Sequence, residues 1–253
     1  MTVRLHRLSV PNGPLAVLEY EARRARGVTL VAAHGYSSSK QNLDGLCAFL
    51  ASHGFGVWSL DFPGHKLGAS GGRLRCADDL LAAMEAAIAA ARAAGATTIY
   101  ALGHSMGATT ALCVAGRDAS LAGAVAIATG FGRPTALDAL AARGVVDLRA
   151  SYVDGLELPQ LATQWEPLLD PALAALTGRP VLFVAAERDG IVSRASVDEL
   201  YRRAGEPKAL ATVASDHTFA ADMSRTVVLS WLNAFHPRVG SRAPAAPLVD
   251  APL

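Results

Sequence analysis

Cysteine is scarce in this chain of 253 residues, and its three cysteines are too far apart to form a C-x-x-C pair. An odd, widely separated set of thiols argues against a disulfide framework, so we expect a reduced, cytoplasmic setting in which the cysteines pack as small apolar residues. Charge of either sign is also low, because 18% of the residues are charged and the net charge is +1. A nucleic-acid partner requires a clustered basic face, so none is expected.

Long hydrophobic runs are absent as well. No segment approaches the roughly 18 apolar residues of a membrane span, and residues 1–7 are charged where a signal peptide would need an apolar stretch. The only notable basic run contains Arg23, Arg24 and Arg26, which a solvated loop explains. Apolar residues are plentiful, at 51%, which is enough for one sizeable core. We therefore expect a soluble, intracellular protein with a single α/β domain.

Segments typical of strands alternate with segments typical of helices for most of the chain. This alternation predicts an α/β fold: a mostly parallel, eight-stranded sheet with helices on both faces. The first two strands are expected to form an antiparallel hairpin around Pro11-Asn12-Gly13. The expected strands are residues 4–10, 15–20, 28–33, 55–60, 98–102, 121–128, 181–186 and 209–214. The expected helices are residues 43–52, 76–94, 108–115, 196–204 and 224–235.

This alternation is interrupted between residues 130 and 178, where apolar side chains are mixed with Pro159, Pro167 and Pro171. The stretch follows the sixth strand, a place where active-site insertions are usual in parallel sheets, so we expect a small helical cap or lid. A crossover helix with long loops is the alternative. The predicted organisation is a core of residues 1–129 and 179–236, a cap of residues 130–178, and a mobile Pro- and Ala-rich tail of residues 237–253.

Two places fit G-x-S-x-G, the pattern of a nucleophile elbow, in which a serine occupies a sharp turn between a strand and a helix. The first, around Ser70, has no apolar strand before it. The second, Gly103-His104-Ser105-Met106-Gly107, lies between the expected strand 98–102 and the expected helix 108–115. Both ends of the motif need small residues, because a Cβ there would collide with the neighbouring strand and helix. Ser105 is therefore the candidate nucleophile.

A serine hydroxyl needs a base within hydrogen-bond reach, and the base needs an acid that orients it. Of the seven histidines, His217 alone follows the last strand and so reaches the carboxyl edge of the sheet beside Ser105. Asp189 comes three residues after the strand 181–186, at the same edge, and Glu187 is its nearest rival. We therefore expect His217 to be the base and Asp189 to be its orienting acid.

An oxyanion hole needs two backbone N–H groups aimed at the developing negative charge. Met106, the residue after the nucleophile, is expected to supply one of them. Tyr36, in the loop after the strand 28–33, is expected to supply the other. His34 in the same loop is expected to brace it. The ring of Tyr36 and the side chain of Trp165 are expected to line the substrate pocket.

Five landmarks follow one another along the chain: His34-Gly35-Tyr36, Asp61-Phe62-Pro63-Gly64-His65, Gly103-His104-Ser105-Met106-Gly107, Asp189 and His217. Together they resemble the α/β-hydrolase superfamily, in which nucleophile, acid and histidine occur in this order. Over roughly residues 15–236 the chain is similar to the branch that contains monoacylglycerol lipases, cinnamoyl or feruloyl esterases and serine aminopeptidase-like hydrolases. It departs from many relatives at Pro63, where Arg is common, and at Lys66, where Gly is usual. Asp61 and His65 are expected to brace their loop.

The residues and the resemblance together imply acyl transfer to water by a carboxylic ester hydrolase. Ser105 would attack an ester carbonyl, His217 would move the proton, and Asp189 would hold the imidazole. No metal or organic cofactor is expected, and the expected partner is a small-molecule ester with a small to medium acyl or aryl group. The same triad serves thioesterases, lipases, peptidase-like amidases and perhydrolases. Outside the enzymes, the alternative is a small-ligand receptor with slow turnover.

Overall fold

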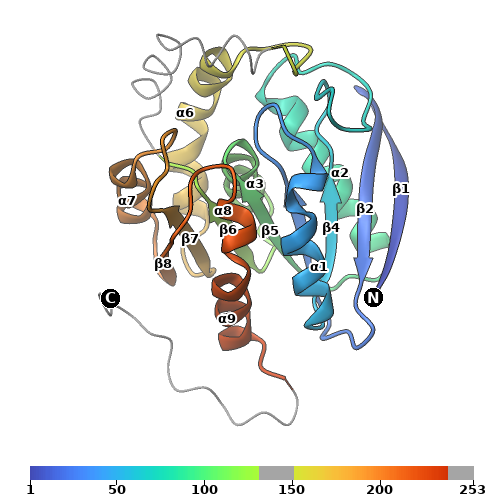
Figure 1. The fold of residues 1–253 in the computed structure, drawn as a ribbon, viewed down its shortest axis with the longest axis vertical. Helices are drawn as coiled ribbons and strands as arrows, with labels where there is room; N and C mark the ends of the chain where they lie inside the picture. The colour runs from blue at the N-terminus through green and yellow to red at the C-terminus, as the bar shows by residue number, and fades with distance from the viewer. Residues whose placement is uncertain (131–150, 239–253) are drawn as a thin grey trace.

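The computed structural model describes residues 1–130 and 151–238, and its centre is an eight-stranded sheet (Figure 1). The strand order is β1-β2-β4-β3-β5-β6-β7-β8. β2 pairs antiparallel with β1 and with β4, whereas the other neighbouring pairs are parallel. The strands are β1 (Thr2–Val10), β2 (Gly13–Glu21), β3 (Val28–Ala33), β4 (Gly56–Leu60), β5 (Thr98–His104), β6 (Gly123–Ile127), β7 (Val181–Ala186) and β8 (Lys208–Val213). The predicted mostly parallel sheet is confirmed.

The five expected helices are present among the described residues with ends shifted by at most two residues, and three further helices were not among those five. They are η1 (Lys40–Leu43), α1 (Asp44–Ser52), α2 (Ala77–Ala93), α3 (Met106–Arg117), α6 (Leu158–Ala175), α7 (Arg194–Arg203), α8 (Ala220–Met223) and α9 (Arg225–Phe235). In α2 the acidic Asp78 and Asp79 occupy the first turn, where they complement the helix dipole. Gly95 follows the end of α2 with a φ of 98°, a conformation that glycine adopts without strain. The expected helix 224–235 is preceded by the additional short helix α8.

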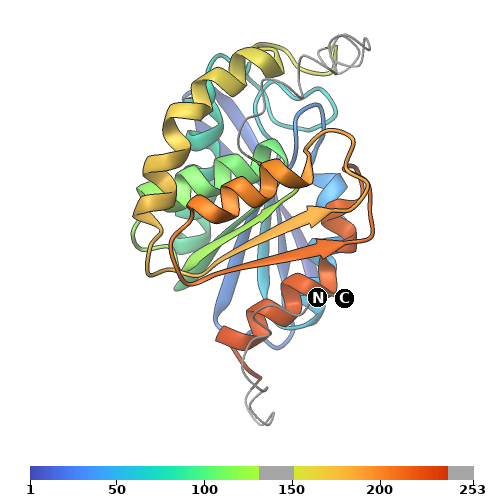
Figure 2. The same ribbon diagram turned by 90° about the vertical axis from the view of Figure 1, so that its left-hand side faces the viewer.

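The helices form two layers, one on each face of the sheet (Figure 2). Side chains of α2, α3, α6 and α7 belong to one hydrophobic core, and side chains of α1, α8 and α9 belong to the other. β3 shows why both cores form: Val31 and Ala33 join the first core, whereas Leu30 and Ala32 join the second. Successive strand residues point to opposite faces, so a sheet covered on both faces requires continuous apolar strands.

The parallel strands end at one common edge, and the predicted site residues follow those ends. Tyr36 comes after β3, Ser105 after β5, Asp189 after β7 and His217 after β8. Loops at the carboxyl edge of an open parallel sheet are the usual place for ligand binding. The topology therefore gathers residues that are far apart in the sequence.

The segment between β6 and β7 contains helix α6, which packs on α3. The packing is close, since a Cβ on Gly116 of α3 would lie 2.6 Å from the Cα of Ala172 in α6. Residues 131–150, the first part of the expected cap, and 239–253, most of the expected tail, lie outside the described residues. The cap boundaries at 130 and 178 and the mobility of the tail stay predictions. Within the described ranges, no helix is both long and apolar enough to cross a bilayer.

Candidate active site

Ser105 occupies a sharp turn between β5 and α3. β5 ends at His104 and α3 begins at Met106, so Ser105 alone connects the two elements. Its φ of 54° and ψ of −115° are strained for a residue with a side chain, at a cost of about 1–3 kcal/mol. The backbone N–H of Ser105 donates to the carbonyl of Ile127 at 2.8 Å, which holds the turn against β6. Strain of this kind is a feature of a nucleophile elbow.

The two glycines of the motif allow the backbones around this turn to approach closely. A Cβ on Gly103 would lie 2.1 Å from the carbonyl carbon and oxygen of Gly107. A Cβ on Gly107 would lie 2.1 Å from the carbonyl oxygen of Ala33 in β3. These are backbone atoms that no rotamer change can move. The structure therefore explains why both ends of the motif must be small.

His217 and Asp189 both lie beside Ser105. The Nε2 atom of His217 is 3.0 Å from the Oγ atom of Ser105. The Nδ1 atom of the same ring is 2.8 Å from the Oδ2 atom of Asp189. The side chains of His217 and Asp189 are 8% and 2% exposed. The three residues selected from the sequence thus form one continuous hydrogen-bonded relay.

The groups around Asp189 keep its carboxylate ionised. Its Oδ1 atom accepts the backbone N–H groups of Ile191 and Val192, both at 2.8 Å. Burial raises the pKa of Asp189, but the bond to His217 and the two backbone donors outweigh it and hold the pKa below its ordinary value. An ionised carboxylate only accepts hydrogen bonds. A neutral His217 beside this carboxylate carries its proton on Nδ1, which leaves Nε2 to accept a hydrogen bond from the hydroxyl of Ser105.

His104 supports the relay in a way that the sequence analysis missed. Its Nε2–H donates to the backbone carbonyl of His217 at 2.8 Å, and the two rings lie 4.9 Å apart. The ring of His104 therefore holds the backbone of His217. The signal for this role in the sequence is a histidine inside the G-x-S-x-G motif, next to the candidate nucleophile.

The rival residues have other partners. The hydroxyl of Ser70 donates to the carbonyl of Asp61 at 2.7 Å and accepts the N–H of Ala16 at 2.8 Å, so it ties a loop to β2. Glu187 is exposed, and none of the contacts among the described residues joins its carboxylate to His217. Neither residue is placed to take part in the relay.

The loop after β3 passes close to Ser105. A Cβ on Gly35 would lie 3.3 Å from the Cβ of Ser105. Tyr36 is 5% exposed, and its hydroxyl donates to the carbonyl of Leu156 at 3.0 Å. Burial raises the pKa of that hydroxyl to about 12, so it stays a donor. Met106 is the first residue of α3, where backbone N–H groups lack partners within the helix. The use of the Tyr36 and Met106 amides as an oxyanion hole stays a prediction.

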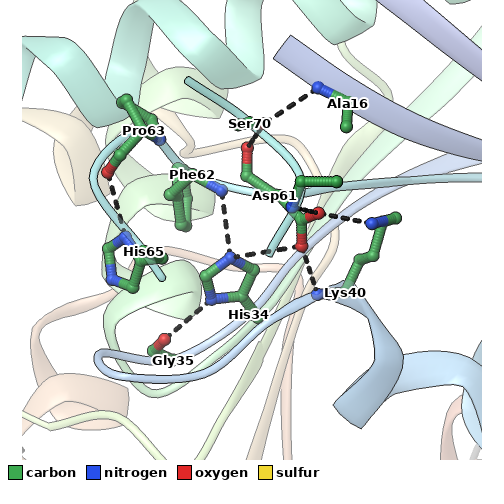
Figure 3. A network of polar contacts seen from close by, with 10 residues as sticks. Ala16, His34, Gly35, Lys40, Asp61, Phe62, Pro63, His65 and Ser70 are labelled. Carbon is green, nitrogen blue, oxygen red and sulfur yellow. Dashed lines mark hydrogen bonds and ion pairs between the residues drawn. The ribbon is translucent and has the colours of Figure 1, made fainter. Parts of the chain in front are cut away.

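A buried polar network holds the loop after β3 against the end of β4 (Figure 3). The Nδ1–H of His34 donates to the carbonyl of Gly35 at 2.8 Å, and its Nε2 accepts the N–H of Phe62 at 3.0 Å. A ring that both donates and accepts is neutral. Burial and the neighbouring His65 lower the pKa of His34, which keeps it neutral. These contacts fit the bracing role expected for His34.

Asp61 is the charged centre of this network (Figure 3). Its buried carboxylate accepts the backbone N–H groups of Lys40 and Ala69, each at 2.8 Å, and contacts the ammonium of Lys40. Burial by itself would raise the pKa of Asp61, but the hydrogen bonds from Lys40 and Ala69 have the larger effect. The pKa therefore lies below its ordinary value, and the carboxyl remains ionised. The Nδ1–H of His65 donates to the carbonyl of Pro63 at 3.0 Å. No sequence motif had pointed to Lys40.

A cavity of about 200 Å³ opens beside Ser105. Its described lining residues are Gly35, Tyr36, Ser37, Ser38, Asn42, His104, Ser105, Tyr152, His217 and Thr218. Tyr36 lies at this cavity as predicted. Trp165 is not among the described lining residues; its side chain is 2% exposed and belongs to the hydrophobic core that α2, α3, α6 and α7 share. Within residues 1–130 and 151–238, no group of three or more His, Cys, Asp or Glu side chains is arranged to hold a metal ion.

Solved structures of similar fold are hydrolases and esterases. An E-2-(acetamidomethylene)succinate hydrolase has a TM-score of 0.69 and 22% identity, and the match covers 92% of this chain and 99% of that one. The Pyrococcus furiosus esterase Pf2001 has a TM-score of 0.66 and 19% identity, and the match covers 91% of this chain and 88% of that one. The Bacillus subtilis carboxylesterase CesB has a TM-score of 0.67 and 17% identity, and the match covers 95% of this chain and 93% of that one. At these identities the likeness is one of fold. A search of the curated proteins finds no match to the sequence.

The comparison with family models shows more than a shared fold. A family model described as "Serine aminopeptidase, S33" matches residues 24–167, which is more than half of the 253 residues. The matched stretch includes the loop after β3 and the elbow with Ser105. The chain belongs to the S33 serine aminopeptidase family of α/β-hydrolases.

Proposed function

We propose that the protein is a serine hydrolase that cleaves carboxylic esters through an acyl-enzyme on Ser105. The observation that carries this proposal is the relay of 3.0 Å from Ser105 Oγ to His217 Nε2 and 2.8 Å from His217 Nδ1 to Asp189 Oδ2. Nucleophile, base and orienting acid lie within the hydrogen-bond reach that proton transfer needs. The ionised state of Asp189 supports the same proposal, because it stabilises a protonated His217.

The proposed reaction has two steps. The hydroxyl oxygen of Ser105 attacks the ester carbonyl while Nε2 of His217 takes its proton, and the same proton then passes to the leaving alcohol as the C–O bond breaks. Water attacks the resulting acyl-enzyme, again with His217 as the base, and Ser105 is released. The backbone N–H groups of Tyr36 and Met106 are proposed to bind the oxyanion, a contribution worth on the order of 100- to 1000-fold in rate for each donor.

The size of the cavity supports small and medium substrates. A volume of about 200 Å³ beside Ser105 accommodates a short acyl chain or one ring. The described lining of the cavity contains neither a carboxylate nor a lysine or arginine, so it offers no such partner to a charged substrate. An uncharged ester of small to medium size is therefore the proposed substrate.

Labelling with a fluorophosphonate probe tests the nucleophile. The probe is expected to modify wild-type protein, and Ser105→Ala is expected to abolish the modification while the fold, followed by circular dichroism, is unchanged. Ser70→Ala is the matched control, because Ser70 occupies the second G-x-S-x-G motif but bonds only to backbone groups in the described contacts. Labelling that survives Ser105→Ala and disappears in Ser70→Ala would reverse the assignment.

A substrate panel tests the reaction class. We expect steady turnover of 4-nitrophenyl esters with short acyl chains, with a decline as the chain lengthens, and methyl ferulate, a monoacylglycerol and an acyl thioester should be compared on the same enzyme. Faster turnover of the thioester would redirect the proposal to a thioesterase. A single burst followed by very slow hydrolysis, together with stabilisation by the ligand, would favour a receptor.

A further inference from the structure

The segment of residues 151–156 lies along the loop that follows β4. The N–H of Asp154 donates to the carbonyl of Gly64 at 2.7 Å, and the N–H of Leu74 donates to the carbonyl of Asp154 at 2.9 Å. The N–H of Leu156 donates to the carbonyl of Leu74 at 2.7 Å. These three backbone hydrogen bonds fix the segment to the loop after β4, next to the cavity that contains Ser105.

Two glycines allow this close backbone approach. Gly155 has a φ of 138°, and a Cβ there would lie 1.9 Å from the carbonyl oxygen of Leu74. Gly64 has a φ of 75°, and a Cβ there would lie 2.6 Å from the carbonyl oxygen of Asp154. Both conformations are ones that residues with side chains rarely adopt. The position of the 151–156 segment therefore depends on a glycine in each of the two segments in contact, Gly155 in one and Gly64 in the other.

Lys66 adds an anchor that a glycine at this position would lack. Its backbone N–H donates to the carbonyl of Tyr152 at 2.9 Å, and its Nζ donates to the carbonyl of Ser151 at 2.8 Å. A glycine at this position could supply only the backbone donor. The side chain of Lys66 thus adds a second bond, to the residue next to Tyr152.

Tyr152 brings an accessible aromatic ring to the cavity beside Ser105. It lines the cavity and is 41% exposed, whereas Tyr36, the other tyrosine of the lining, is 5% exposed. None of the lining residues within the described ranges is Leu, Ile, Val or Met. The described wall is therefore suited to a ring and to polar groups, and it offers little to a long alkyl chain.

We infer that Tyr152, held in place by Lys66, selects esters that carry a flat aromatic ring. This inference rests on the proposed ester hydrolysis at Ser105 and narrows its substrate class. Aromatic rings attract one another in offset-stacked or edge-to-face arrangements, beyond the effect of buried area alone. Because the backbone of Tyr152 is already fixed, binding a substrate orders only the side chain and not the main chain, so more of that attraction remains as affinity. A cavity of about 200 Å³ holds one such ring.

Matched pairs of flat and puckered substrates test the role of the Tyr152 ring. 4-Nitrophenyl benzoate is compared with 4-nitrophenyl cyclohexanecarboxylate, and phenyl butyrate with cyclohexyl butyrate, so that the ring is placed on each side of the ester in turn. For at least one pair, Tyr152→Ala and Tyr152→Leu are expected to lower the flat-to-puckered ratio of kcat/KM by about three- to tenfold. Tyr152→Phe is expected to keep the ratio. Phe235→Ala, at an aromatic residue of nearly equal exposure outside the described lining, is the control.

Variants of Lys66 test the anchor. Lys66→Met removes the Nζ donor and keeps both the length of the side chain and the backbone N–H. It is expected to raise KM for the flat substrate of the sensitive pair by about two- to fivefold with little change in kcat, because it disturbs binding and not the chemical step. Lys66→Arg, which can still donate to the carbonyl of Ser151, is expected to restore most of the KM. A loss of kcat equal for all substrates would contradict a positioning role.

The possible results separate this inference from the proposed function. A wild-type enzyme that hydrolyses the esters, with ratios that Tyr152→Ala leaves unchanged in both pairs, would overturn the selectivity of Tyr152 and leave the ester hydrolase intact. A wild-type protein that hydrolyses none of the four esters and is not labelled at Ser105 would overturn the proposed function and this inference together.

Discussion

The ammonium of Lys40 and the carboxylate of Asp61 form an ion pair that is buried on both sides. Lys40 is 3% exposed, and Asp61 is fully buried at the end of β4. The pair joins the loop after β3, which carries Tyr36, to the loop after β4. A charge left alone at this depth has no water to solvate it, so the two side chains depend on one another.

Removal of one partner is therefore expected to be costly. Lys40→Met should lower the free energy of unfolding by about 3–5 kcal/mol, because the carboxylate of Asp61 would remain buried without its counter-ion. The double variant Lys40→Met with Asp61→Asn should lose less than the sum of the single variants. Urea unfolding followed by circular dichroism measures both. Arg194→Met, which breaks an exposed pair with Asp198, is the control and should cost about 0–1 kcal/mol. Equal losses in Lys40→Met and Arg194→Met would contradict the dependence.

The relay also predicts a large effect of Asp189→Asn. The amide of asparagine can donate to Nδ1 of His217, which would move the ring proton to Nε2 and remove the acceptor for Ser105. We expect kcat for 4-nitrophenyl butyrate to fall by about 10⁴-fold while the fold is retained. Asp216→Asn is the matched control, since asparagine can still accept the N–H groups of Thr218 and Phe219. A rate near wild type in Asp189→Asn would remove Asp189 from the mechanism.

The glycines of the elbow give a steric prediction. Gly107→Ala places a Cβ 2.1 Å from the carbonyl oxygen of Ala33, so β3 and α3 must separate. We expect a loss of about 3 kcal/mol in the free energy of unfolding and loss of most activity, because Ser105 and Met106 lie in the same turn. Gly190→Ala is the control, since its Cβ would meet no atom within 4 Å. Its stability should stay within about 0.5 kcal/mol of wild type. Similar stabilities of the two variants would show that the close approach is not as described.

Much of this site could be predicted because its residues follow strand ends. Ser105 comes directly after an apolar strand, Asp189 and His217 come three and four residues after theirs, and a parallel sheet must bring such positions to one edge. The local sequence therefore carries the information that places the relay. The elements themselves were predictable for the same reason, since continuous apolar runs between polar segments distinguish buried strands from the helices that cover them.

Contacts between side chains of separate loops could not be predicted in this way. Lys40 reaches Asp61 across 21 positions, and a lysine in a polar segment gives no sign that it will be buried. The position of Trp165 in the core illustrates a related point: an aromatic residue has the same sequence pattern whether it lines a cavity or packs in a core. The position of Tyr152 could not be predicted either, because its partner Lys66 lies 86 positions away and binds it through backbone atoms.

The buried histidines His34 and His65, which belong to the polar network between the loops after β3 and β4, predict how stability depends on pH. Burial lowers the pKa of His65 to about 4, opposed in part by its bond to Pro63, and burial together with His65 lowers the pKa of His34. Both values lie below the value of about 6.5 for a histidine in an unfolded chain. Between about pH 6.5 and pH 4 the unfolded chain therefore binds protons that the folded chain does not.

Stability should accordingly be complete above about pH 6.5 and fall as the pH drops toward 4. The slope should approach about 1.4 kcal/mol per pH unit for each of the two histidines. His65→Asn keeps a side-chain donor for the carbonyl of Pro63 but no longer titrates. Below pH 6 the slope of the unfolding free energy against pH should therefore decrease by close to about 1.4 kcal/mol per pH unit, the effect of one proton, whatever the stability of the variant at pH 7. Urea unfolding at half-unit steps from pH 7.5 to pH 4.5 measures the slope in both proteins. Parallel curves for wild type and His65→Asn would show that His65 is not held neutral by the fold.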